Sequence, residues 1–194
     1  MTDLGQTPSQ TVGPYYSMAL ARPGENVLWH EDVDGSPVRV EGTVLDGDGL
    51  VIDDALIELW QANAAGRYRH PVDARLAVLL DPAFTGAGRA ATELTSGLWW
   101  FTTVKPGPVP GPDGRPQAPH LCLVVQARGM LLPSFTRMYF PEDGDLLAAD
   151  PILGAVPAQR RSTLVASLVA KQPVPTYRFD IRFQGDDETV FFDL

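Results

Sequence analysis

The side chains that could do chemistry mostly fall outside the spacings that familiar sites need. The turn Asp46–Gly49 starts like a calcium-binding loop, but the twelfth position is Ile57 instead of a bidentate glutamate, so a hairpin turn is the better interpretation. His30 and Glu31 are not followed by a second histidine four residues after the first, which excludes a zinc-protease helix. The sequence also lacks a glycine-rich phosphate loop and a nucleophile-elbow serine.

The charge and the cysteine content limit which partners and which cellular compartment the sequence predicts. The 194 residues include 15 Lys and Arg against 24 Asp and Glu, a formal net charge of -9, which argues against nucleic acid or an anionic membrane as a partner. Any anionic ligand therefore needs a locally placed cation. Cys122 is the single cysteine, so no intramolecular disulfide can form. Because the start resembles no secretory signal and no apolar run approaches the ~20 residues of a membrane span, we expect a cytoplasmic protein.

The elements that must position any site are short strands. With 18 glycines and 18 prolines, the chain is too rich in turn residues for a helical bundle. Alternating apolar residues predict seven strands, over 38–46, 55–61, 98–104, 121–127, 136–140, 177–183 and 189–192. Residues 158–170 predict one short helix near the C-terminus. We therefore expect an all-β protein, an antiparallel β-sandwich with long loops.

The domain organisation is predicted to be simple. No repeat, low-complexity block or boundary divides the chain, so we expect a single domain over 1–194. Residues 1–37 have few periodic apolar positions and four prolines, which favour extended backbone. They predict an N-terminal docking arm that is ordered only by docking.

Five strings of sequence carry a family resemblance. They are Trp60–His70 (WQANAAGRYRH), Leu80–Phe84 (LDPAF), Lys105–Pro110 (KPGPVP), Ala118–Cys122 (APHLC) and Thr136–Phe140 (TRMYF). Their order and spacing resemble the intradiol ring-cleavage dioxygenases, specifically the protocatechuate 3,4-dioxygenases, from about Thr7 to the strand at 177–183. In that family the catalytic subunit holds one non-haem ferric ion by two tyrosinates and two histidines. These donors suit Fe(III), a hard cation, and leave room for a catechol to chelate it.

Only half of that ligand set carries over to this sequence. The first tyrosine falls on Tyr68 and the first histidine on His120, but the second tyrosine position is Val109 and the second histidine position is Cys122. The family's arginine three residues before the first histidine falls on Gln117. Valine has no donor atom, and one cysteine does not recreate the N/O site. The resemblance therefore implies a non-iron-binding alpha subunit, with no catalytic residue of its own and only vestigial metal positions.

The remaining ligand-type residues are better interpreted as structural. We expect Tyr68 and His120 to be packed or hydrogen-bonded, and Cys122 to be a small core side chain. One alternative remains, a self-sufficient iron enzyme that uses these three side chains and a solvent ligand.

The arm is the first segment that the resemblance assigns to substrate binding. In this family the alpha subunit's arm lines the cavity of its beta partner, and the counterparts here are Thr11, Gly13, Pro14 and Tyr15. Gly13 allows a close backbone approach, Pro14 stiffens the turn, and the two hydroxyls can hydrogen-bond a ligand. The sequence leaves open whether Tyr15 or Tyr16 faces the cavity. The alternative is an arm that only adds buried area.

Arg137 is the second candidate for substrate binding. It lies in an otherwise apolar string where the catalytic chain has glutamine, and an arginine there needs an anionic partner. The carboxylate or catecholate of the substrate could supply that charge. The alternative is a structural salt bridge to one of the 24 acidic residues.

The resemblance also implies a reaction and a partner. The expected reaction converts 3,4-dihydroxybenzoate and O2 to 3-carboxy-cis,cis-muconate, in the catabolism of aromatic compounds. Fe(III) is expected in the beta subunit, with αβ units assembled into a larger oligomer. The rival to this interpretation is a scaffold or binding β-sandwich subunit that makes no direct contact with substrate.

Overall fold

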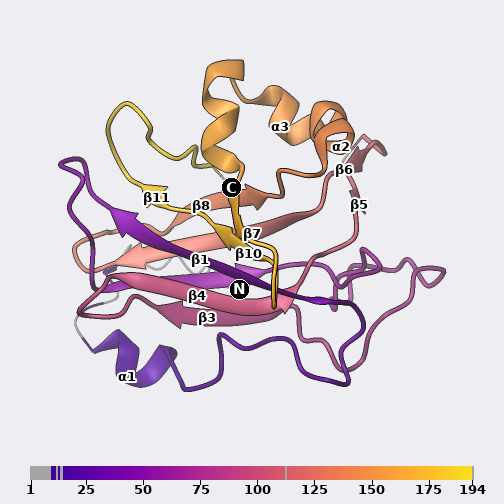
Figure 1. Ribbon diagram of the computed structural model, residues 1–194, viewed down its shortest axis with the longest axis horizontal. Coiled ribbons are helices and arrows are strands. Elements are labelled where there is room, and N and C mark those ends of the chain that lie inside the picture. The colour runs from indigo at the N-terminus through magenta and orange to yellow at the C-terminus, as the bar shows by residue number, and fades with distance from the viewer. Residues whose placement is uncertain (1–9, 12, 14, 112, 194) are drawn as a thin grey trace, which may run out of the picture.

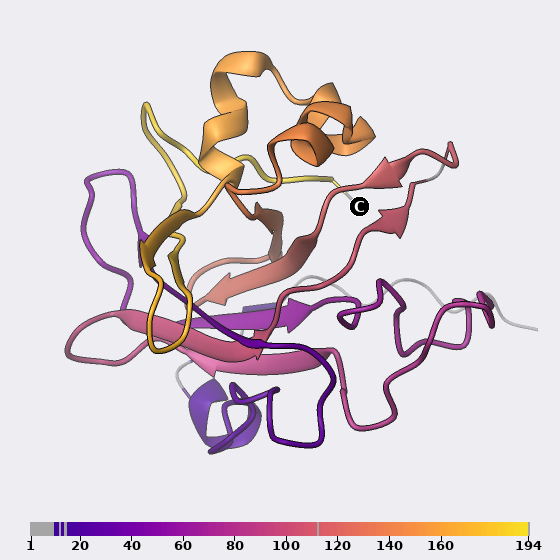
Figure 2. The same cartoon turned by 45° about the vertical axis from the view of Figure 1, so that its right-hand side comes forward.

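Two β-sheets packed face to face form the body of the protein, and the computed structural model describes residues 10, 11, 13, 15–111 and 113–193 (Figure 1). In the view of Figure 1 the helical segments after β8 lie above the strands, whereas the first helix lies below them; Figure 2 shows the same arrangement from a view turned by 45°. The all-β sandwich predicted from the sequence is confirmed.

The first sheet is built around β1 (Pro37–Leu45). This strand pairs antiparallel with β4 (Leu98–Val104) and parallel with β10 (Thr176–Arg178) and β11 (Ile181–Arg182); β9 (Ser167–Ala170) pairs antiparallel with β10. Every second side chain of β1 is buried, as the apolar alternation requires. The sheet is therefore mixed, because the C-terminal strands run parallel to β1.

The second sheet is antiparallel and carries the candidate site. Its order is β3 (Ala87–Ala91), β2 (Ala55–Trp60), β7 (His120–Ala127) and β8 (Ser134–Tyr139). A separate ribbon pairs β5 (Val109–Pro110) with β6 (Pro116–Gln117). Inward side chains of both sheets form one core that includes Leu59, Trp99, Phe101, Leu123 and Met138.

Short helical segments complete the fold. They are α1 (Tyr16–Leu20), α2 (Gly144–Ala149), α3 (Pro151–Ala155) and the 3₁₀ segment η1 (Ala158–Leu164). Asp150 caps α3 by accepting from the backbone N–H groups of Ile152 and Leu153, and Pro151 occupies the first helical position. None of the helices in the described part of the chain is long and apolar enough to cross a membrane.

Two expectations about local structure were wrong, and a third was right only in part. The helix expected over 158–170 is a 3₁₀ segment followed by β9, because the second half of that sequence pairs with β10 instead of continuing a helix. Residues 189–192 form no strand, only an isolated bridge between Phe192 and Phe135. The strand expected over 177–183 is divided between β10 and β11.

Candidate functional site

The outer face of the second sheet brings the predicted site positions together. His120 and Cys122 are two residues apart on β7, so their side chains share one face. The strand register places Cys122 between Trp60 of β2 and Arg137 of β8. His120 lies opposite Tyr139, with 5.7 Å between ring centroids.

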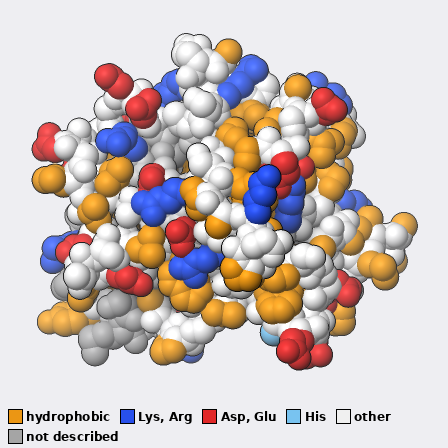
Figure 3. Space-filling model, viewed as in Figure 1, with side chains coloured by type: hydrophobic (Ala, Val, Ile, Leu, Met, Phe, Trp, Pro, Cys, Tyr) orange, Lys and Arg blue, Asp and Glu red, His pale blue; other side chains and the backbone are white. Residues whose placement is uncertain are grey.

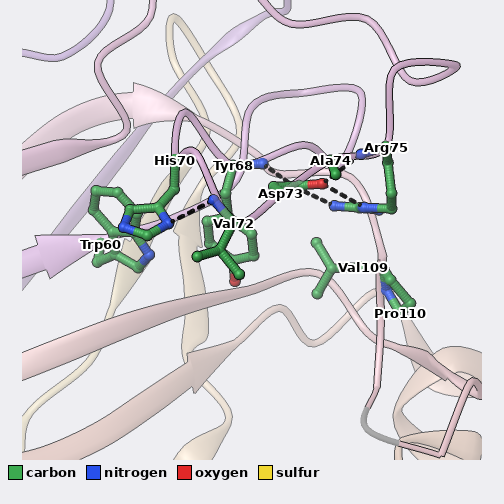
Figure 4. Close-up of a pocket in the computed structure, with 9 residues that line it drawn as sticks. All are labelled: Trp60, Tyr68, His70, Val72, Asp73, Ala74, Arg75, Val109 and Pro110. Carbon is green, nitrogen blue, oxygen red and sulfur yellow. Dashed lines mark hydrogen bonds and ion pairs between the residues drawn. The ribbon is translucent and has the colours of Figure 1, made fainter.

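Tyr68 reaches this face from the segment that follows β2. Its ring stacks on Trp60, with centroids 5.9 Å apart and planes inclined by 7°. The backbone N–H of Tyr68 donates to Asp73 Oδ2 at 2.9 Å, and Arg75 Nη2 holds the same oxygen at 2.6 Å. This ion pair fixes the backbone of the segment at the edge of the site (Figure 4).

A pocket of about 760 Å³ opens beside Tyr68 and Trp60. Val109 of β5 lines it on the side away from Trp60, where its two methyl groups offer no donor atom (Figure 4). The loop that carries Val109 packs closely on the preceding segment: Gly66 has φ +82°, and a Cβ there would overlap the carbonyl oxygen of Pro108. The two strings WQANAAGRYRH and KPGPVP thus meet at the site through a glycine contact.

Three ligand-type side chains are neutral. Burial lowers the pKa of His120 to about 4, with a further contribution from the Arg137 charge. His120 Nδ1 lies 2.7 Å from the carbonyl oxygen of Ala118, so this nitrogen carries the ring hydrogen. Burial also raises the pKa of the Tyr68 phenol and of the Cys122 thiol. At neutral pH the site therefore presents a phenol, a neutral imidazole and a thiol.

Arg137 is the cation among these neutral groups. Its Nη1 donates to Gln117 Oε1 at 2.6 Å, and its guanidinium carbon lies 5.9 Å from the centroid of the Phe192 ring. No carboxylate reaches ion-pair distance of Arg137 within the residues that the structure describes. The salt bridge considered as its alternative is thus not formed there, and the substrate contact stays a prediction.

The N-terminal arm is anchored on the far end of β7. Thr11 Oγ1 accepts from the backbone N–H of Gly129 at 2.9 Å, and Gly13 has φ +72°. Tyr16 is 7% exposed and its hydroxyl donates to the carbonyl oxygen of Ala55 at 3.1 Å, whereas Tyr15 is 75% exposed. Of the two tyrosines, Tyr15 is therefore the one free to contact another molecule. Pro14 lies outside the described residues.

Comparison with known proteins identifies the family of this chain. A family model described as Dioxygenase matches residues 11–185. Over its whole length the chain is 42% identical to the full-length protocatechuate 3,4-dioxygenase alpha chain of Burkholderia cepacia. It is 39% identical to the alpha chain of Pseudomonas putida, over 98% of each chain. The chain belongs to the intradiol ring-cleavage dioxygenase family.

The chain is also similar to a beta chain and to solved structures. The beta chain of the Burkholderia cepacia enzyme is 41% identical over 163 residues, covering 80% of this chain and 67% of that one. Hydroxyquinol 1,2-dioxygenase from Pseudomonas putida DLL-E4 matches with a TM-score of 0.61 and 20% identity, over 80% of this chain and 58% of that one. The dioxygenase domain from Streptomyces sp. SirexAA-E matches with a TM-score of 0.59 and 22% identity, over 96% and 100% of the two chains. At these identities the structures establish the shared fold.

The donor set of this intradiol dioxygenase chain does not fit the ferric ion of its family. Tyr68 and His120 supply one phenol and one imidazole, and Val109 supplies nothing. Cys122 supplies a partly buried, protonated thiol instead of a second imidazole. The expectation that it is a core side chain was wrong, because it lies on the outer face of β7 and not among the buried residues between the sheets. The guanidinium of Arg137 beside it adds a positive charge where a ferric ion would need negative or neutral oxygen and nitrogen donors.

Two residues that matter for the site were missed by sequence reasoning. Asp150 is 1% exposed, and its Oδ2 accepts from the backbone N–H of Ala118 at 2.7 Å, beside the carbonyl that orients His120. Arg128 precedes Gly129, where Thr11 is anchored; its side chain is 63% exposed and pairs with Asp54 at 2.9 Å. The sequence could have pointed to Asp150 through the Asp-Pro pair that starts α3, but nothing local marked Arg128.

Proposed function

We propose that this chain is the non-iron-binding alpha subunit of a protocatechuate 3,4-dioxygenase. It completes the substrate cavity of an iron-bearing beta subunit, which cleaves 3,4-dihydroxybenzoate with O2 to 3-carboxy-cis,cis-muconate. Both oxygen atoms enter the product and the bond between the two oxygen-bearing carbons breaks, so the reaction needs no external reductant. The beta subunit supplies the ferric ion that binds the catechol.

One observation carries this proposal. The chain is similar to alpha chains over its full length, yet two of the four ligand positions, Val109 and Cys122, lack the family's donors. A chain that keeps the fold and loses the metal donors needs a partner for catalysis. The similarity to a beta chain supports a partner built on the same fold.

The arm is the part of this chain that we assign to the partner's cavity. We take residues 1–37 as a docking arm of a single domain. Thr11 fixes the arm to Gly129, in the turn after β7, and Tyr16 fixes it to Ala55 of β2, so Tyr15 lies between two anchored residues and is exposed. An exposed aromatic hydroxyl held this way can hydrogen-bond a ligand at little entropic cost. Gly13 and Pro14 belong to the same cavity-lining segment.

Two arginines are candidates for the cation that an aromatic acid needs. Arg137 was assigned this role from the sequence, and it remains a candidate there. Arg128 is a second one, because it lies next to the arm's anchor and is largely exposed. In a chain of net charge -9, either guanidinium would counter the general repulsion of a carboxylate.

Assembly is supported by an exposed apolar segment. The stretch 71–80 carries Val72, Leu76 and Leu79, all more than three-quarters exposed, and hydrophobic side chains gather on the projection at the right-hand edge of Figure 3. Clustered exposed apolar side chains mark contacts with other molecules. We assign this segment to subunit contacts in an oligomer of αβ units, in the cytoplasm.

A scaffold role without substrate contact is the second candidate, and specific contacts favour it. The polar ends of Thr11 and Arg137 are both engaged within this chain, to Gly129 and Gln117. If these bonds persist in the complex, the exposed candidates left to touch substrate are Tyr15 of the arm and Arg128.

A pair of matched variants separates the two candidates. Tyr15→Phe removes an exposed hydroxyl and Tyr16→Phe removes a buried one, so both lose one oxygen atom from neighbouring residues of the arm. In the purified αβ complex we expect Tyr15→Phe to raise KM for 3,4-dihydroxybenzoate several-fold. The Tyr16→Phe complex should keep its KM and lose about 1 kcal/mol of stability. An unchanged KM for Tyr15→Phe, with Tyr15→Ala equally silent, would leave the scaffold role in place.

A further inference from the structure

The four former ligand positions, Tyr68, Val109, His120 and Cys122, are here called the degenerate site, and Arg137 lies beside it. Arg137 is the direct neighbour of Cys122 across the β7–β8 ladder, on the same outer face. Its bond to Gln117 draws the guanidinium toward the ribbon that carries Val109, since Gln117 pairs with Val109 in the β5–β6 ladder. The side chain therefore points from one former ligand position toward another.

Among the residues that the structure describes, no carboxylate lies within ion-pair distance of this cation. The charge of Arg137 contributes to the pKa values of Tyr68, His120, Cys122 and Tyr139, so all four lie within electrostatic reach of the guanidinium. Within the described residues its hydrogen bond goes to a neutral amide. An adjoining pocket of about 280 Å³ includes Asp193, which does not reach ion-pair distance. Asp150 also acts on the pKa values of His120 and Tyr139, but its oxygens accept from the backbone N–H groups of Ala118, Ile152 and Leu153. Arg75 acts on the pKa of Tyr68 and is paired with Asp73. Arg137 is thus a cation beside the former ligand positions that has no carboxylate of its own among the described residues.

We infer that Arg137 excludes metal from this chain: its guanidinium stands among the former ligand positions and repels a cation there. Like charges repel most strongly where protein replaces water, and a ferric ion carries three positive charges. Restoring the two missing donors should therefore not restore iron binding while Arg137 is present. This inference rests on the proposed function, because it explains how an alpha chain stays free of iron.

The test compares variants of the full chain after incubation with ferric citrate. The first, Val109→Tyr/Cys122→His, restores the four-donor set with Tyr68 and His120. The second adds Arg137→Gln, which removes the charge and keeps a group able to hydrogen-bond Gln117. The control adds Arg182→Gln instead, the same loss of charge in β11 of the other sheet.

The readouts are iron per chain and the visible absorption band of tyrosinate bound to iron. We expect iron binding to be at least tenfold greater in the variant with Arg137→Gln, at close to one iron per chain. The first variant and the Arg182→Gln control should both stay near the background. Equal iron in the first and second variants would overturn the inference. The inference would also be overturned if the second variant bound no iron while still showing a cooperative thermal transition.

A smaller pair covers the case in which the multiple variants do not fold. Cys122→His alone leaves three donors, and Cys122→His with Arg137→Gln removes the cation from beside them. With Co2+ as the probe, the second should bind at least tenfold more tightly, and equal affinity would overturn the inference. Stoichiometric iron in the unaltered chain would overturn the proposed function together with this inference. Equal iron in the first and second variants, with none in the unaltered chain, would overturn the inference alone.

Discussion

Asp150 is a buried residue that supports the geometry of the degenerate site. Its Oδ1 accepts from the backbone N–H groups of Ile152 and Leu153, each at 2.8 Å, and lies 3.4 Å from the hydroxyl oxygen of Tyr139. Its Oδ2 accepts from the N–H of Ala118 at 2.7 Å. One buried carboxylate thus joins the start of α3, the end of β8 and the segment that leads into β7.

Replacing Asp150 by alanine should cost about 3–4 kcal/mol of unfolding free energy. Loss of a helix N-cap costs about 0.5–2 kcal/mol. The N–H of Ala118 would in addition be left buried without an acceptor, at about 1–3 kcal/mol. The two terms are not fully additive, and the sum is a large share of the roughly 5–15 kcal/mol that stabilises an ordinary domain.

The assay is urea denaturation of the purified chain, followed by tryptophan fluorescence. The midpoint of Asp150→Ala should fall with an unchanged m-value. Asp150→Asn should lose about half as much, because its amide oxygen can still cap α3 while its NH2 group cannot accept from Ala118. Asp48→Ala, in an exposed hairpin turn, is the control and should stay within about 0.5 kcal/mol of the unaltered chain. A loss below about 1 kcal/mol for Asp150→Ala would refute this reasoning.

Two further predictions concern the backbone and the histidine. Gly66→Ala should lose about 2–3 kcal/mol in urea denaturation, because its Cβ would overlap Pro108, whereas Gly114→Ala, with φ +80° but open space, should lose about 1 kcal/mol; equal losses would contradict the packing argument. His120 has a folded pKa of about 4 against an ordinary 6.5, so the unfolded chain binds a proton that the folded chain does not between these values. The unfolding free energy should therefore fall as pH drops from 6.5 to 4, by up to about 3 kcal/mol, and His120→Gln should remove that part of the pH dependence. An identical pH profile in the variant would show that the proton binds elsewhere.

The sequence predicted the strands that depend on local alternation. β1, β2, β4, β7 and β8 were placed to within about two residues. Burial alternates along most of β1, β4 and β7, as their sequences indicate, whereas β2 and β8 also bury consecutive residues. The error at 158–170 has a physical cause: an apolar pattern of that length fits a helix, but β10 offers a partner that only the folded chain supplies. Short strands such as β3 and β5 lack enough periodic residues to be recognised.

The sequence predicted which residues make up the site better than it predicted the contacts between them. The strings around Tyr68 and His120 marked the degenerate positions, because they are continuous in sequence. The bond from Arg137 to Gln117 joins two elements, and the role of Asp150 joins three, so neither follows from spacing alone. The distinction between Tyr15 and Tyr16 likewise needed the position of Ala55 in β2.

Iron content and turnover, measured on three preparations, test the central claim most directly. The preparations are this chain alone, the beta chain alone, and the two chains purified together from one cell. We predict that this chain alone holds no stoichiometric iron and does not open the ring of 3,4-dihydroxybenzoate. The joint preparation should hold one iron per αβ unit and turn over with a lower KM than the beta chain alone. Iron and ring cleavage in this chain alone would contradict the account, and so would a beta chain whose KM does not change when this chain is bound.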